Sequence, residues 1–192
     1  MTKTRALWAS LVLATLSIAV AGTPAQADPP GQQTVFYFAG TMTLTSPASS
    51  PLFAPETEVV VKLEYDEAHN QVHLIGHDRV VGGAVTAFED TMTRVGDTNV
   101  FDFVQPATGL FGDITWQGPE WRWNHWTYNL SSPYLPVHLG GYGFRNHRGM
   151  VLHYEVTSTI DGSVVGILDT IAPTVTEAEY NAIVADMEAD LP

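Results

Sequence analysis

The chain has 192 residues, of which 45% are hydrophobic and 15% charged, with 16 Gly, 12 Pro and no Cys. A collagen-like or low-complexity chain would carry far more Gly and Pro, and a disordered acidic chain would lack the 5 Trp, 7 Tyr and 8 Phe found here. The formal net charge of −13 argues against binding to nucleic acid or anionic lipid, whose phosphates would repel the protein. The absence of Cys excludes a disulfide framework and a thiolate site.

The first 27 residues have the pattern of a secretory signal peptide. Two basic residues precede an apolar stretch over residues 7–20, and residues 25–27 (Ala-Gln-Ala) fit an A-x-A cleavage site. The apolar stretch is shorter than the roughly 20 residues that a membrane-spanning helix needs. We therefore predict a secreted or periplasmic protein with no membrane anchor after cleavage, and a single domain over residues 28–192.

Most of the remaining chain alternates apolar and polar residues with period two and is rich in β-branched side chains, which predicts strands. The expected strands are, in chain order, residues 35–45, 58–65, 72–78, 84–94, 99–104, 113–117, 121–130, 150–159 and 164–171. Three Pro and three Ser make residues 46–55 a loop. Asp161 and Gly162 between the last two strands predict a hairpin, because both residues tolerate positive φ.

Two segments near the C-terminus differ from this pattern. Residues 131–148 are rich in Gly and Pro, and we interpret residues 140–145 (Gly-Gly-Tyr-Gly-Phe-Arg) as a loop over a barrel mouth, where Arg145 or Arg148 could meet an anionic head group of a ligand. Thr176 and Glu179 fit a capping box, and apolar residues then recur at helical spacing. This predicts one amphipathic helix over about residues 177–189.

Eight or nine antiparallel strands joined by short turns, with one late helix, predict an all-β protein that is a β-barrel or a β-sandwich. We favour an up-and-down barrel with the helix packed outside it. The order of meandering strands, a Trp-rich strand, a hairpin around Asp161 and Gly162, and an acidic helix opening with residues 177–180 (Glu-Ala-Glu-Tyr) resembles small bacterial lipocalin-like (calycin-type) proteins of uncharacterised function. This resemblance implies a cavity for a small ligand.

The most distinctive segment is residues 116–128, which hold four of the five Trp. Alternation in a strand divides its side chains between two faces. One face holds Trp121, Trp123 and His125. The other holds Arg122, Trp126 and Tyr128. We take the first set as facing inward, where it could line a pocket with Arg122 or His125 as a polar anchor. The second set could form an outer stacking platform or pack beneath the helix, and core packing by all these rings is the alternative.

Metal and catalytic motifs are weak in this sequence. His69, His73 and His77 are four residues apart, which is about 13 Å along a strand and too far for one zinc ion with bonds of roughly 2 Å. We predict no metal site and no cofactor. There is no G-x-S-x-G nucleophile motif. Glu89 and Asp90 are adjacent and point to opposite faces, so one of them faces inward and could orient a ligand or act as a base with a raised pKa.

These observations favour an exported, monomeric barrel that binds a small apolar or aromatic molecule of unknown identity. The expected ligand contacts are Trp121, Arg122, Trp123, His125, Trp126, Tyr128 and Arg145. Two alternatives stay open at this point: a barrel enzyme using an inward His or carboxylate, and a surface interaction or carbohydrate-binding module using exposed aromatic rings.

Overall fold

The computed structural model describes residues 34–50, 52–105, 109–117, 125–146 and 148–190, and the expected signal peptide lies outside these residues. The described elements are β1 (Thr34–Ser46), β2 (Glu56–Asp66), β3 (Gln71–Val80), β4 (Val85–Arg94), β5 (Val100–Gln105), β6 (Leu110–Gln117), β7 (His125–Ser131), β8 (Val137–Asn146), β9 (Gly149–Ser158), β10 (Val164–Pro173) and α2 (Glu177–Glu188). The strands form a closed antiparallel barrel in which consecutive strands are neighbours and β1 also pairs with β10. The barrel, rather than the sandwich, is therefore confirmed.

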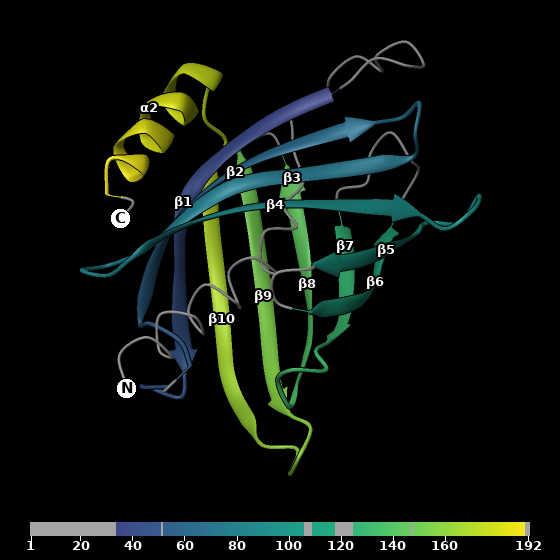
Figure 1. Ribbon diagram of the computed structural model, residues 1–192, viewed down its shortest axis with the longest axis vertical. Helices are drawn as coiled ribbons and strands as arrows, with labels where there is room; N and C mark the ends of the chain where they lie inside the picture. Colours follow the sequence, from purple (N-terminus) through teal and green to yellow (C-terminus); the bar gives the residue numbers. More distant parts are fainter. Residues whose placement is uncertain (1–33, 51, 106–108, 118–124, 147, 191–192) are drawn as a thin grey trace.

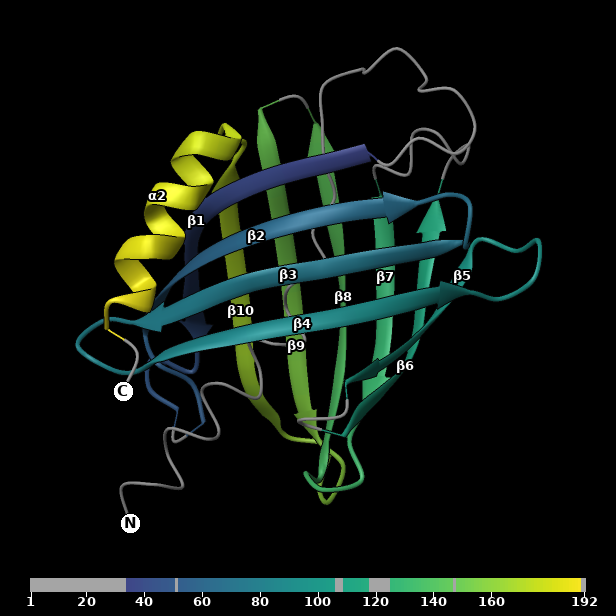
Figure 2. The same ribbon diagram turned by 45° about the horizontal axis from the view of Figure 1, so that its top comes forward.

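The barrel is built from two layers whose strands cross steeply, with β2–β4 in one layer and β8–β10 in the other (Figures 1 and 2). Strand β1 bends sharply and belongs to both layers, because it pairs with β2 over residues 34–43 and with β10 over residues 41–46. The bend depends on Gly40, where a Cβ would lie 2.0 Å from the Ile171 carbonyl oxygen. A side chain at this position would push β1 and β10 apart.

Alternation along each strand sends one set of side chains into the barrel and the other set outward. The inward set forms one large core of buried apolar residues that includes Phe38, Leu63, Leu74, Trp116 and Leu168. The expected hairpin also agrees with the structure, because Gly162 adopts a positive φ of 73° between β9 and β10.

The structure has ten strands where the sequence predicted eight or nine, and β8 is the strand that was missed. It occupies Val137–Asn146, so residues 140–145 are part of the barrel wall and the prediction of a loop there was wrong. The glycines of β8 give room for neighbours: a Cβ at Gly143 would lie 2.1 Å from the Trp126 ring, and one at Gly141 would lie 2.1 Å from the His153 carbonyl oxygen. Low strand propensity is here outweighed by close packing.

Helix α2 was predicted almost to the residue and lies outside the barrel, against β1–β3 (Figure 2). The Thr176 hydroxyl accepts a hydrogen bond from the Glu179 backbone N–H at 3.2 Å, and the Glu179 carboxylate accepts one from the Thr176 N–H at 2.8 Å. Buried Tyr180 and Met187 pack on Val60, whose side chain points outward from β2. No helix in the described part of the chain is long and apolar enough to cross a membrane.

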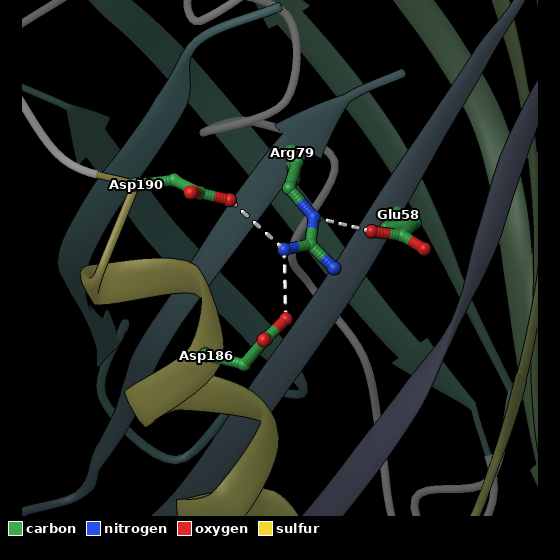
Figure 3. A network of polar contacts seen from close by, with 4 residues as sticks. All are labelled: Glu58, Arg79, Asp186 and Asp190. Carbon is green, nitrogen blue, oxygen red and sulfur yellow. Dashed lines mark hydrogen bonds and ion pairs between the residues drawn. The ribbon is translucent and has the colours of Figure 1, made fainter. Parts of the chain in front are cut away.

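The C-terminal end of α2 is held by Arg79 of β3 (Figure 3). Its Nε donates to Glu58 at 2.6 Å, and its Nη1 donates to Asp186 at 2.8 Å and to Asp190 at 3.2 Å. The last turn of the helix contains no basic residue. Arg79 therefore supplies the positive charge that the negative end of the helix dipole and its two carboxylates require.

We expect Arg79→Gln to loosen α2 while the barrel stays folded, because the helix then loses the cation at its C-terminal end. The thermal midpoint should fall by a few degrees, and amide hydrogens of Glu177–Glu188 should exchange faster by mass spectrometry. Arg148→Gln, at an exposed position, is the matched control and should change neither measurement. Unchanged exchange in the helix of Arg79→Gln would show that apolar packing alone holds α2.

Candidate functional site

Aromatic rings gather inside the barrel at the end where β6 ends and β7 begins. Trp116 is the centre of this group: its ring lies 5.1 Å from that of Trp126, 6.1 Å from Phe101 and 6.3 Å from Tyr65. The ring of Phe36 meets Tyr65 edge-on at 6.2 Å. We call these five residues the aromatic end of the barrel. Their rings pack against one another in the interior core, and aromatic rings are the residue type that commonly lines small-molecule sites.

Arg145 brings a positive charge to the aromatic end. It lies on the interior face of β8, two residues beyond Gly143, and its guanidinium carbon is 5.4 Å from the centre of the Phe36 ring. Burial lowers the pKa of Arg145 from its ordinary value, with Tyr65 nearby acting in the opposite direction. Burial raises the pKa of Tyr65.

Further along the interior, the rings of Tyr128 and Tyr154 stack 4.8 Å apart at an angle of 15°. Burial raises the pKa of both hydroxyls. Their ring faces therefore pack in the core, and their hydroxyls place polar atoms among its apolar side chains.

An interior carboxylate lies where β4 and β5 separate. These two strands pair in register only from Met92 to Arg94. Beyond that point the Gln105 side chain donates a 2.8 Å hydrogen bond to Asp90, which is 4% exposed. Burial raises the pKa of Asp90 to about 6, and the hydrogen bond from Gln105 acts against this rise. Of the pair at positions 89 and 90, Asp90 is thus the inward member.

A second buried carboxylate, Asp78, lies on the interior face of β3, where it pairs with Thr86 of β4, and Thr57 of β2 lies on the same face opposite Val80, two residues along β3. We call these three residues the polar wall. Asp78 is 2% exposed, and burial raises its pKa to about 7 although Thr86 donates hydrogen bonds to it from its hydroxyl and backbone. Sequence reasoning did not single out Asp78. The signal was present, because it continues the inward alternation of Val72, Leu74 and Gly76.

The structure corrects the expected faces of the Trp-rich strand. Trp126 and Tyr128 are 1% and 5% exposed and lie in the core, so they neither form an outer platform nor pack under α2. His125 is exposed on the outer face and stacks on Phe144 at 5.7 Å, so it is not an interior anchor. The inward position of Trp126 is possible because Gly143 opposite it leaves room for the ring. The expected contacts Trp121, Arg122 and Trp123 lie outside the described residues.

The outer wall carries two polar features. His153 pairs with Asp169 at 2.8 Å and stacks on the half-exposed ring of Tyr142 at 5.0 Å. Asp169 also borders an open groove of about 690 Å³ on β1 and β10, whose floor includes Thr43 and Ile171. Within the described ranges, no three His, Asp or Glu side chains converge as a metal site would require.

Comparisons with known proteins give no family. No family model matches the chain, and no curated protein matches it. Among solved structures, the chain is similar to one described as the structure of EF1p2_mFAP2b bound to DFHBI. The two chains share 8% identity over 73% of this chain and 92% of that one, with a TM-score of 0.35. What this chain binds has to be argued from its own residues.

Proposed function

We propose that this protein binds a small, largely apolar or aromatic molecule inside the barrel, at the aromatic end. The observation that carries this proposal is the guanidinium of Arg145, which projects among aromatic rings on the interior face of β8. An aromatic wall with one polar anchor is the usual composition of a small-molecule site. A ten-strand barrel is also wider than the eight-strand barrels whose interior just holds one small ligand.

The ligand contacts, the export and the oligomeric state predicted from the sequence are part of the same proposal. The segment that joins β6 to β7 contains Trp121, Arg122 and Trp123. At the aromatic end β6 ends and β7 begins. These three residues are therefore proposed as ligand contacts together with Trp126 and Arg145. We further propose an exported, monomeric, lipocalin-like protein, consistent with the N-terminal sequence pattern and the barrel.

A titration with 1-anilinonaphthalene-8-sulfonate tests the binding proposal, because this probe has an apolar aromatic body and one anionic group. We expect saturable binding of one probe per chain with enhanced fluorescence. Arg145→Gln should weaken it by about tenfold, the effect of losing one charge-assisted hydrogen bond. Arg148→Gln removes the same charge at an exposed position and is the control. Equal binding by both variants, or no saturable binding, would contradict the proposal.

A barrel enzyme is the second candidate, favoured by one observation. The pKa of Asp78 is raised to about 7, where a carboxyl group can both accept and donate a proton near neutral pH. The two functions differ in what happens to the bound molecule. A compound that co-purifies with the native protein should be released unchanged by a binding protein. If it is converted by the wild type and not by Asp78→Asn, the enzyme is the correct assignment.

A further inference from the structure

Two atoms of the polar wall have unsatisfied hydrogen-bonding capacity inside the barrel. Oδ2 of Asp78 and Oγ1 of Thr57 are both buried and have no hydrogen-bond partner among the described residues. The residues themselves are 2% and 1% exposed. A buried polar atom without a partner costs about 1–3 kcal/mol, and more when it is charged. Thr86 donates hydrogen bonds to the Asp78 carboxylate, and these bonds hold the oxygen that lacks a partner in a fixed place.

The interior face that holds these two atoms carries one aromatic ring beside Asp78 along β3 and no cation from β2 or β3. The ring of Phe88 lies over Gly76, which precedes Asp78 on the interior face, and a Cβ at Gly76 would come within 2.4 Å of that ring. The basic residues of β2 and β3 face outward. Lys62 pairs with Glu64, and Arg79 pairs with Glu58 and with Asp186 of α2. The carboxylate is therefore without a counter-ion from β2 or β3.

We propose that Asp78 and Thr57 bind the protonated amine of an apolar or aromatic ligand inside the barrel. This inference rests on the proposed function, binding of a small molecule inside the barrel, and adds a second subsite that recognises a chemical group. An ammonium group has three donors, enough for Oδ2 of Asp78 and Oγ1 of Thr57 together. It also supplies the missing counter-charge, and the nearby ring of Phe88 favours a cation. The net charge of −13 attracts cationic ligands from solution.

This subsite lies far from Arg145 along the barrel. Val72 pairs with Tyr65, which is close to Arg145, and Asp78 lies six residues further along β3, about 20 Å. Asp78 projects from β3 and Arg145 from β8, and these strands belong to the two opposing layers (Figure 1). A small ligand held at the polar wall therefore does not reach Arg145, and the amine subsite can be tested by itself, with ligands that carry only the amine.

Three probes of matched shape test the inference on the full chain: 2-phenylethylamine, 2-phenylethanol and propylbenzene. Binding is measured by calorimetry and by quenching of the interior Trp fluorescence. For the wild type we expect the amine to bind most tightly and the hydrocarbon most weakly. Asp78→Asn should weaken the amine by about thirtyfold or more, as when one partner of a buried charge pair is removed. It should leave propylbenzene nearly unchanged.

Two further variants complete the test. Thr57→Val keeps the side-chain shape and should weaken the amine by about five- to tenfold through loss of one acceptor. If circular dichroism shows that Asp78→Asn does not fold, Thr57→Val alone tests the inference. Asp102→Asn removes an exposed carboxylate from β5 and should change nothing. If all three probes bind but neither polar-wall variant affects the amine selectively, the inference is overturned and the binding proposal stands. If no probe binds to any variant, both are overturned.

Discussion

Trp126→Ala should lower the free energy of unfolding by about 3–5 kcal/mol, the usual cost of truncating a buried Trp. The Trp126 ring is 1% exposed, lies 5.1 Å from the ring of Trp116 and fills the space left by Gly143. Its removal leaves a cavity between β7 and β8 that rigid strands cannot close. Urea unfolding followed by circular dichroism measures this change.

The control for this substitution is Thr127→Ala, at the next position of β7. Thr127 is exposed on the outer face, so its loss should cost less than about 1 kcal/mol, within the range of strand propensity. Hydrogen exchange in α2 should be the same in both variants, because the helix packs on β1–β3 and not on β7. A loss below about 1.5 kcal/mol for Trp126→Ala would mean that this ring is not part of the core.

The second large effect is a pH dependence of stability that arises from Asp78. Burial raises the pKa of its carboxyl group from 3.8 to about 7, so the folded state binds the proton more tightly than the unfolded state. The stabilising contribution is complete below about pH 4 and is lost as the pH rises through about 7. We expect the wild type to lose about 2–3 kcal/mol relative to Asp78→Asn between about pH 5 and pH 8.

The measurement is the difference between the two unfolding free energies at each pH. Asp90, whose pKa is raised to about 6, is present in both proteins, so its contribution cancels. The chain neighbours of Asp78 both face outward. His77 pairs with Glu188, and Arg79 pairs with Glu58 and Asp186. A difference that does not vary with pH would show that Asp78 ionises as readily in the folded chain as in the unfolded one.

The barrel and the helix could be predicted because their signals are local. Strands such as β7 alternate with period two over their whole length, and Thr176 with Glu179 is a capping signal contained in four residues. Strand β8 could not be found in this way. Gly143 leaves room for the ring of Trp126 on β7, and Gly141 leaves room for the His153 carbonyl oxygen on β9; both contacts exist only after the strands pair.

In the candidate site, too, local patterns could be predicted, and features that depend on contacts across the barrel could not. Alternation correctly separated Trp126 and Tyr128 from His125, but which face points inward depends on what lies across the barrel, and the expected direction was wrong. An inward carboxylate at positions 89 and 90 was expected, and the structure identifies it as Asp90. Its bond to Gln105 joins positions 15 residues apart that sequence spacing does not relate.

The pairing of β1 with β10 governs how the chain reaches its fold. Thr41 pairs with Ile171, so the last seam of the barrel joins segments from nearly opposite ends of the described chain. The other strand pairs can form one after another from neighbouring hairpins, whereas this seam must wait until β10 has been synthesised. Contacts of such long sequence separation slow folding, into the range of milliseconds to seconds for all-β domains. Until the seam closes, β1 and β10 each present an unpaired edge that can pair with another chain, so aggregation during refolding should depend on protein concentration.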